Sequence, residues 1–431
     1  MSSHTSVEGS GSPSARTTPW QWVAVAVLSL STFVVVTSEM LPVGVLTPMA
    51  EGLRISPGTA GFSLSITGLV TAVTAPAVPR LLGALDRRVV LAVAMVVLAA
   101  GNALTTMAGG FGLLVVSRVV IGVGMGAVWG LASAVAPRLV APRNATLAVS
   151  LAIGGVAAAS VIGVPLGTLV GNSFGWRAAF ASLSAAAVLL AAGLLMALPR
   201  LPRPAAPAGD GHIGREPLLR NASVAAGLVL IVFLVTAHFA AYTYVRPVLE
   251  ERTGSTPGTI ALLLLVYGVF GLIGNFASGA LAARRARTTV LGLTVGIGAS
   301  VALLALFGAI AGVTGVSIAL WGLTYGGLSV AGQIWMTQSA PHRAEHVTGL
   351  YVGVFTAAIA LGAFLGGLVV EAAGITPLLW SATALALAAL AVGLFGPGPT
   401  PRSGRAGGDS SSTPEQPLET AAVTGTGGTQ A

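Results

Sequence analysis

Three side chains that can carry a charge near neutral pH lie deep inside long apolar stretches of this sequence: Glu39, Arg118 and His238. A charge at the middle of a membrane costs at least ~2.5–3.5 kcal/mol, so such residues usually face a cavity and have a partner. A carboxyl and an imidazole can also take up and release a proton, which is the chemistry that a proton-driven process needs. These three residues are therefore the first candidates for the chemistry of the protein.

Glu39 stands in the stretch "VVVTSEMLPVGVL" (34–46), three residues before Pro42. Proline cannot donate a hydrogen bond to the carbonyl of Ser38, and its ring crowds that carbonyl. We expect the helix to open immediately before Glu39, which is tolerable where the helix lines a wet cavity. A carboxyl in such a cavity can exchange protons near neutral pH. The alternative is a structural acid bonded to Arg118 or to nearby hydroxyls.

The composition explains why so few charges are available. Of the 431 residues, 54% are hydrophobic and only 8% are charged, whereas a soluble domain carries about 25% charged residues. Lipid is therefore the expected solvent. The chain has no cysteine, which excludes disulfides and thiol chemistry. The net charge of +8 comes from arginines scattered over short loops, so we expect no nucleic-acid partner.

Twelve segments are long and apolar enough to span a membrane, which takes about 20 residues each. The only long polar interior stretch divides them six and six, which predicts an N-terminal half at 20–198, a cytoplasmic linker at 199–220 and a C-terminal half at 221–396. The ends, 1–19 and 397–431, are low in large apolar residues and are expected to be disordered cytoplasmic tails. The predicted spans are 20–49, 59–82, 88–108, 111–138, 144–172, 175–198, 221–249, 258–283, 288–312, 314–340, 345–372 and 374–396.

The arginines predict the orientation of these spans, because short cytoplasmic loops collect them. With the N-terminus inside, only Arg54, Arg177, Arg246 and Arg252 fall outside. At 1.5 Å per residue, Glu39 then lies about 15 Å and Arg118 about 10 Å below the outer surface. These depths allow an ion pair or alternating pairing. A structural anchor to backbone carbonyls is the alternative for Arg118.

The two halves repeat. At an offset of 199, "LGTLVGNSFGW" (166–176) matches "LGGLVVEAAGI" (365–375). Parallel repeats of six spans place a substrate site near the midplane between the halves.

The same offset places Glu39 opposite His238, since it sets "VVTSEM" (35–40) against "LVTAHF" (234–239). If the halves are related by a pseudo-twofold axis, the two residues occupy equivalent positions on opposing walls. They could then share a proton or the substrate. A histidine hydrogen-bonded to Thr236 or Tyr242 is the alternative.

The sequence resembles the major facilitator superfamily over residues 20–396, and more narrowly the twelve-span drug:proton antiporters near the bacterial sugar (arabinose-type) efflux and chloramphenicol-resistance exporters. The motifs that carry the resemblance are "TSEMLPVGVL" (37–46), "LLVVSRVVIGVGMGAVWG" (113–130), "IGVPLGTLVGNSFGWRAAF" (162–180) and "TAHFAAYTYVRPVL" (236–249). The resemblance implies an all-α integral membrane protein with twelve helices in two pseudo-symmetric six-helix halves. It also implies a monomer in the bacterial inner membrane, and a role in coupling for Arg118.

The cytoplasmic loop motif of that superfamily is degenerate here. In "PRLLGALDRR" (79–88), Gly83 and Ala84 replace an aspartate and an arginine, and only Asp86, Arg87 and Arg88 remain recognisable. The charge-relay gating attributed to that aspartate in the family is therefore not expected to operate in its usual form.

A small-residue stripe lies in the fifth predicted span. Gly163, Gly167 and Gly171 recur every four residues and allow close helix contact, while Pro165 bends the helix. In the antiporters that the chain resembles, this motif is taken to seal the domain interface against leak. An ordinary packing seam would make the same contacts.

Polar and aromatic residues elsewhere in the spans are candidates for the substrate cavity, with helix packing or interfacial anchoring as the alternative for each. They are Trp129, Tyr242, Tyr244, Asn275, Gln333, Trp335 and Tyr351.

The leading expectation is a secondary exporter that exchanges a small molecule (a drug, a sugar or a related metabolite) for protons by alternating access. No phosphate-binding loop occurs, so we expect a proton gradient as the energy source and no cofactor. No His/carboxylate cluster with metal-ligand spacing and no nucleophile beside a base occurs, so we expect neither a metal site nor an enzyme. An uncoupled facilitator or a transport-fold sensor is the alternative.

Overall fold

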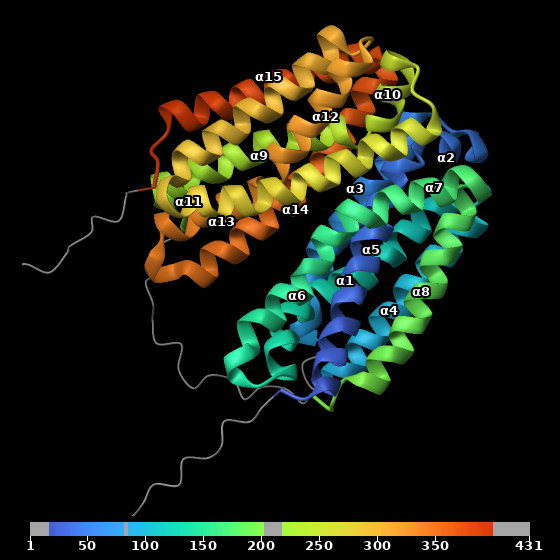
Figure 1. Cartoon of the computed structure of the whole chain (residues 1–431), viewed down its shortest axis with the longest axis vertical. Helices are drawn as coiled ribbons and strands as arrows, with labels where there is room; N and C mark the ends of the chain where they lie inside the picture. Colours follow the sequence, from blue (N-terminus) through green and yellow to red (C-terminus); the bar gives the residue numbers. More distant parts are fainter. Residues whose placement is uncertain (1–16, 82–84, 202–217, 400–431) are drawn as a thin grey trace, which may run out of the picture. The chain divides into compact units, whose positions relative to one another are not determined.

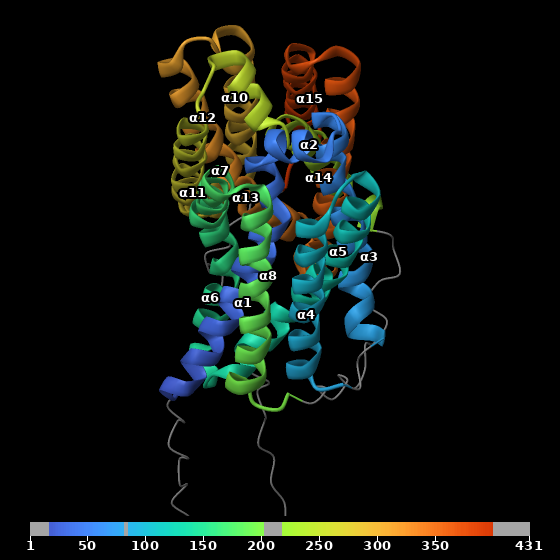
Figure 2. The ribbon, with the colours of Figure 1, turned by 90° about the vertical axis from the view of Figure 1, so that its right-hand side faces the viewer.

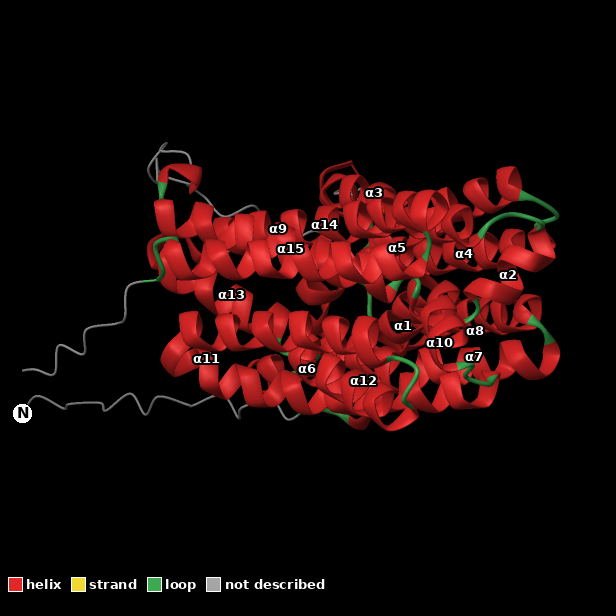
Figure 3. Cartoon of the chain, turned by 90° about the horizontal axis from the view of Figure 1, so that it is seen from above, coloured by secondary structure: helices red, strands yellow, loops and turns green. Residues whose placement is uncertain are grey.

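The structure is a computed structural model that describes residues 17–81, 85–201 and 218–399. Within these ranges the regular elements are all helices (Figure 3). The predicted tails and the linker lie largely outside the described residues, as do Gly83 and Ala84 of the loop motif.

Long helices make up the first half of the chain (Figure 1). They are α1 (Pro19–Gly44), α3 (Pro57–Leu81), α4 (Arg87–Met107), α5 (Phe111–Val135), α6 (Ala145–Ala158), α7 (Val164–Phe174) and α8 (Trp176–Ala197). A π-helical turn, η3 (Ala159–Gly163), joins α6 to α7, and α2 (Leu46–Leu53) is a short helix after α1. Two 3₁₀ turns, η1 (Ala136–Leu139) and η2 (Pro142–Asn144), connect α5 to α6.

The second half has the same plan. Its long helices are α9 (Ala222–Tyr242), α11 (Pro257–Phe307), α12 (Ala311–Gly326), α13 (Leu328–Ser339), α14 (Ala344–Ala373) and α15 (Ile375–Phe395). The short helix α10 (Val245–Thr253) follows α9, as α2 follows α1. The 3₁₀ turns are η4 (Leu218–Arg220) and η5 (Pro341–Arg343).

The described residues contain 11 helical stretches that are long and apolar enough to cross a membrane. One of them, α11, runs for 51 residues and is interrupted at Arg285, whose φ of −143° and ψ of 66° are not helical. Residues 257–284 and 286–307 on either side are each long enough to span. The eighth and ninth predicted spans are thus joined without a loop. Counting α11 as two spans turns the 11 stretches into the twelve spans predicted from the sequence.

Helix α1 carries Glu39 and does not open in front of it, contrary to the sequence prediction. Pro42 lies inside the helix, which continues to Gly44, and the main chain leaves helical geometry at Val45 (φ −120°, ψ 20°). Proline still gives the carbonyl of Ser38 no donor. The turn stays helical because its neighbours Leu41 and Val43 are fully buried and hold the backbone in place.

The backbone repeats at the positions that the sequence alignment pairs. Val45 (φ −120°, ψ 20°) and Tyr244 (φ −105°, ψ 17°) make the same turn after α1 and α9. Gly175 and Gly374, which the repeat also aligns, have positive φ angles of 87° and 86° at corresponding helix junctions. Only glycine adopts such angles without strain, so the two junctions require the same residue.

The π turn in the fifth span has a local cause. Pro165 stands at the start of α7, where its missing N–H would otherwise leave a gap in the helical hydrogen bonds. A π-helical turn is one way in which a membrane helix adjusts around proline. The turn brings Ser160 and Val161 against Gly268 of α11, where an added Cβ would lie 2.6 Å from the Ser160 carbonyl oxygen.

Contacts between the two halves follow two pairs of helices: α14 packs along α3, and α11 packs along η3 and α7. The short helices α2 and α10 also touch and lie at the end of the helices away from Pro19 (Figure 2). These contacts set which of the candidate residues can meet across the halves.

Candidate functional site

Glu39 is buried in α1, with 8% of its surface exposed. It makes no hydrogen bond or ion pair with any residue that the structure describes. The adjacent Ser38 is satisfied, because its hydroxyl accepts from Nδ2 of Asn102 at 3.0 Å. The hydroxyl partner that sequence analysis allowed for Glu39 is therefore not found among the described residues.

Arg118 of α5 is fully buried and likewise has no counter-ion among the described residues. Its guanidinium carbon lies 5.0 Å from the centre of the Phe180 ring of α8, and its three nitrogens have no hydrogen-bond partner among the described residues. The ring face supplies some negative potential. The predicted ion pair with Glu39 is not formed in this conformation, because the guanidinium is directed onto Phe180.

His238 is the centre of a buried aromatic group that we call the histidine cluster. Trp321 of α12 donates its indole Nε1–H to Nδ1 of His238 at 2.9 Å. The Tyr325 ring is nearly parallel to the imidazole, with centroids 3.4 Å apart and planes 3° apart. The Tyr267 hydroxyl lies 3.5 Å from Nε2. The members of the cluster are His238, Phe239, Tyr242, Tyr267, Trp321 and Tyr325.

Tyr325 links this cluster to Glu39. Five of the six cluster residues are buried, whereas Tyr325 remains partly exposed. Tyr325 also interacts electrostatically with Glu39 of α1. Glu39 and His238 are not in direct contact; Tyr325 stacks on His238 and lies within electrostatic range of Glu39.

Sequence reasoning found His238 and Tyr242 but missed the rest of the cluster. Trp321 and Tyr325 are four residues apart on one helix and therefore share a face. The same spacing relates His238 to Tyr242. Paired i and i+4 aromatic residues in otherwise aliphatic spans were the available signal.

Several predicted cavity residues are used in helix packing instead. Tyr244 donates to the carbonyl of Ala363 at 3.0 Å, and Asn275 donates to that of Gly326 at 3.1 Å. Hydrogen bonds to carbonyls also hold Trp335 and Tyr351, at 3.1 Å each. A residue whose polar group is satisfied this way has little left to offer a substrate. Of the remaining candidates, Trp129 is partly buried and Gln333 is exposed.

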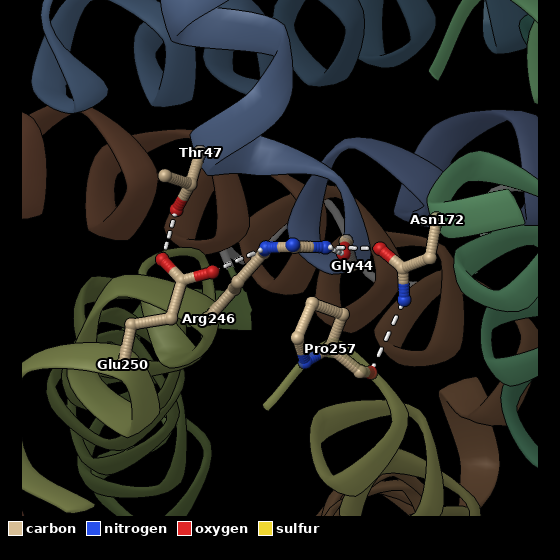
Figure 4. Close-up of polar contacts among 6 residues, drawn as sticks. All are labelled: Gly44, Thr47, Asn172, Arg246, Glu250 and Pro257. Carbon is tan, nitrogen blue, oxygen red and sulfur yellow. Dashed lines mark hydrogen bonds and ion pairs between the residues drawn. The ribbon is translucent and has the colours of Figure 1, made fainter. Parts of the chain in front are cut away.

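A second polar group joins the two halves, and we call it the polar clasp (Figure 4). Arg246 of α10 pairs with Glu250 at 2.8 Å, and it donates to the Gly44 carbonyl at 2.6 Å and to Oδ1 of Asn172 at 3.1 Å. The side chain of Arg246 is 5% exposed and that of Glu250 is 27% exposed. The clasp consists of Gly44, Thr47, Asn172, Arg246, Glu250 and Pro257.

The clasp draws on five helices, α1, α2, α7, α10 and α11. Thr47 of α2 donates to the Glu250 carboxylate, and Asn172 of α7 donates to the carbonyl of Pro257, which begins α11, at 3.1 Å. The carbonyl of Gly44 is available because α1 ends there. Asn172, to which sequence analysis gave no role, therefore bridges the halves.

A further contact lies at the same end of the helices. The carboxylate of Glu371 in α14 accepts from the backbone N–H of Thr59 at 3.1 Å and from the Ser56 hydroxyl. It thereby satisfies the first turn of α3, where a negative charge also suits the helix dipole. The Tyr244 hydroxyl contacts the Gly58 carbonyl at 3.3 Å.

Of the hydrogen bonds whose two partners the structure describes, those that cross between the halves all lie at this end, which we call the clasp end. The sequence marked Arg246 only as an arginine of an outer loop. No periodic pattern connects it with Gly44 or Asn172, so only the folded chain brings these residues together.

The loop-motif remnant at the opposite end has a structural role. Asp86 caps α4 by accepting from the N–H of Arg88 at 2.9 Å, and it also accepts from the N–H of Leu201 at 3.0 Å. The N–H of Arg87 donates to the Leu201 carbonyl at 3.1 Å. Partial burial raises the pKa of Asp86, but these two N–H donors and the charges of Arg88 and Arg200 outweigh it, so the pKa lies below its ordinary value.

We expect the Asp86→Ala variant to lose about 1 kcal/mol of stability at neutral pH, as other lost helix caps do, and Asp86→Asn to keep most of it. Because the pKa of Asp86 is lowered on folding, its charge stabilises the fold above the unfolded pKa, and that contribution disappears as pH falls below about 4. Thermal unfolding in detergent between pH 3 and pH 7 measures both effects. Equal acid sensitivity in Asp86→Asn and the wild type would contradict this account.

The glycine stripe of the fifth span lies against α1 of its own half. An added Cβ would meet Thr37 at Gly163, Leu41 at Gly167 and Val45 at Gly171. Ser160 and Val161, on another face of the span, pack against Gly268 of the second half, and Asn172 bonds to it through the clasp.

A groove of about 260 Å³ lies between α11 and α15. Its lining is aliphatic apart from Thr294 and Thr383, whose hydroxyls donate to carbonyls of their own helices. It therefore offers no polar group with which to orient a substrate.

Known proteins similar to this chain were found by sequence and by structure. A sequence model described as Major Facilitator Superfamily matches residues 28–355 and 228–425. The chain is 33% identical over 376 residues to the Purine ribonucleoside efflux pump NepI of Escherichia coli O6:K15:H31 (strain 536 / UPEC), which covers 86% of this chain and 93% of that protein. The pump of the same name from Shigella sonnei (strain Ss046) gives the same figures.

Two solved structures share the fold. The nucleoside transporter NupG, crystallised as a mutant, has a TM-score of 0.72 at 14% identity and covers 87% of this chain and 98% of its own. A bacterial homologue of the human lysosomal transporter Spinster has a TM-score of 0.68 at 14% identity, covering 88% and 97%. At such identities these likenesses bear on the fold alone.

The all-helical fold and the motif resemblance predicted from the sequence are both confirmed by these comparisons. The chain is a multi-pass membrane protein whose relatives are transporters of small molecules and not enzymes. It belongs to the Major Facilitator Superfamily.

Proposed function

We propose that the protein exports a small molecule containing a flat heterocycle, with purine ribonucleosides as the first candidates, in exchange for protons. The observation that carries the proposal is the position of Glu39, a buried carboxyl on α1 that has no hydrogen-bond or ion-pair partner among the described residues. The relatives named as purine ribonucleoside efflux pumps support the substrate class.

Glu39 has the properties of a proton carrier because its charged and neutral forms differ greatly in free energy within the membrane. An unpaired carboxylate within the membrane is penalised by at least ~2.5–3.5 kcal/mol, whereas the protonated acid is not. A change in hydration, or the arrival of a cationic or hydrogen-bonding group, therefore shifts the balance between the two states. Arg118 can supply such a group if its guanidinium leaves the Phe180 ring, which is the alternating pairing expected from the sequence.

Tyr325 gives the substrate class a physical basis. An aromatic side chain can stack on any nucleobase, and such stacking is worth about 1–3 kcal/mol per base. Its phenol can also donate to or accept from the substrate. Glu39 on the facing half adds an acid that can hydrogen-bond ring nitrogens or ribose hydroxyls.

The clasp supports alternating access. Hydrogen bonds between the halves at the clasp end hold that end closed, and the arginine distribution predicts that this end faces outside. The described conformation would then be the one that accepts substrate from the cytoplasm. Export requires the clasp to break as the halves rock about the midplane.

Flux measurements in inside-out vesicles from a pump-deficient host test the proposal. We expect an acid-inside gradient to drive uptake of radiolabelled guanosine and adenosine, with arabinose and chloramphenicol as probes of the other substrate classes. Uptake that survives collapse of the gradient would identify an uncoupled facilitator. Uptake of arabinose or chloramphenicol without the nucleosides would contradict the proposed substrate class.

A further inference from the structure

We infer that His238 acts as a neutral imidazole in a single tautomer, which bonds the buried Trp321, holds Tyr325 as the ring-stacking wall of the substrate path, and does not carry the transported proton. The part concerning the substrate rests on the proposed function. The part concerning the imidazole rests only on the contacts of His238. It departs from the sequence expectation that His238 shares a proton with Glu39.

The Trp321 contact determines which ring nitrogen is unprotonated. An indole Nε1–H can only donate a hydrogen bond. Its distance of 2.9 Å to Nδ1 of His238 is that of a well-formed bond, so this nitrogen must present its lone pair. A ring turned by 180° would place Cδ2, which cannot accept, against the indole N–H, so the same contact also determines the orientation of the ring.

The opposite nitrogen then carries the proton of the neutral ring. This nitrogen lies 3.5 Å from the Tyr267 hydroxyl oxygen, which can accept a long and weak hydrogen bond from its N–H. An imidazolium would place two N–H donors against each other at the Trp321 contact. It would therefore lose the shortest hydrogen bond of the cluster.

Among the residues that the structure describes, no acid contacts the ring to compensate such a charge. The titratable groups that face His238 are the phenols of Tyr242 on α9, Tyr267 on α11 and Tyr325 on α12. Glu39 of α1 acts on Tyr325, as does Tyr351 of α14. A fully buried imidazole among aromatic rings is a poor site for a mobile charge.

The same contacts explain how His238 orders the wall. Trp321 and Tyr325 lie one turn apart on α12, and His238 bonds the first while it stacks on the second. The imidazole thereby fixes the plane of Tyr325, the one partly exposed ring of the cluster. A substrate ring that stacks on Tyr325 meets a surface that is already oriented, so less entropy is lost on binding.

The first test does not depend on the substrate. The full-length chain is labelled with ¹⁵N-histidine, and the spectrum of the His238→Gln variant is subtracted to isolate the His238 signals. We expect one unprotonated and one protonated nitrogen whose shifts stay constant from pH 5 to pH 8, the range in which an unperturbed histidine titrates. Titration within that range, or two signals of imidazolium type, would overturn the neutral assignment even if guanosine is transported.

The second test separates positioning from proton transfer by guanosine kinetics in inside-out vesicles. His238→Phe keeps a flat ring but leaves the Trp321 N–H without an acceptor, so we expect KM to rise about tenfold with the pH profile unchanged. Trp321→Phe removes the donor and should give a similar KM. Because both substitutions break the same Trp321–His238 hydrogen bond, the KM of the double variant should be no higher than that of the more affected single variant.

His238→Gln is the rescue variant, since its carbonyl oxygen can accept from Trp321. We expect the KM of His238→Gln to lie close to the wild-type value and its pH profile to match that of the wild type. An unchanged KM in both His238→Phe and Trp321→Phe would overturn the positioning role, as would a shifted pH profile in His238→Gln. If His238→Phe does not fold, Trp321→Phe and His238→Gln still decide the question.

Discussion

We expect the Glu39→Gln variant to lose export driven by a proton gradient, while exchange of labelled guanosine at equal pH continues. Glutamine occupies nearly the same volume, so the packing of α1 should persist. Glutamine has no ionisable proton, so this side chain can no longer carry a proton on the return step of the transport cycle. We expect gradient-driven uptake in inside-out vesicles to fall to the level of vesicles without the protein.

The matched control is Glu51→Gln, which removes an exposed carboxyl on the neighbouring α2. This variant should transport like the wild type, because the exposed acid is solvated in both charge states. Gradient-driven export that survives in Glu39→Gln would remove Glu39 from the coupling mechanism. Loss of exchange as well as of gradient-driven export would indicate that Glu39 contacts the substrate.

The second large effect is expected at the clasp. Arg246→Gln removes the ion pair with Glu250 and the charge-assisted hydrogen bonds to Gly44 and Asn172. Because the ion pair lies within α10, it does not bias the halves; the two charge-assisted hydrogen bonds of Arg246 that cross between the halves do, and we take about 2 kcal/mol for their loss. That energy shifts the equilibrium between closed and open clasp ends about thirtyfold toward the open one.

The absence of cysteine makes this shift measurable, because spin labels can be placed without background. Exposed positions Glu51 on α2 and Glu251 on α10, changed to cysteine and labelled, report the separation of the halves at the clasp end. Arg246→Gln should broaden the distance distribution toward longer values. Arg54→Gln, which removes an exposed arginine at the same end, should leave it unchanged. Identical distributions in the wild type and Arg246→Gln would mean that the clasp does not hold the halves together.

The spans were largely predictable because lipid imposes one simple condition, a run of apolar residues about 20 long. Helix ends were less predictable. The eighth and ninth spans join through a kink at Arg285, and α1 passes through Pro42 without opening.

Charged residues inside the spans could also be identified from the sequence, since each is costly there and stands out from its surroundings. Their partners could not. Arg118 lies over Phe180, and His238 accepts from Trp321, which is 83 residues away in the chain. Most predicted cavity residues, such as Tyr244 and Trp335, donate to carbonyls of adjacent helices instead.

By itself, the sequence determined the solvent of this protein, its twelve spans, its internal repeat and the positions of Glu39, Arg118 and His238, because these follow from composition, periodicity and the cost of charge in lipid. Tertiary structure alone decided that Trp321 and Tyr325 pack against His238, and that Arg246 joins the two halves through Gly44 and Asn172. The physical reason is that hydrogen bonds and ring stacking depend on distances of a few ångströms between segments far apart in the chain. No local pattern encodes such distances.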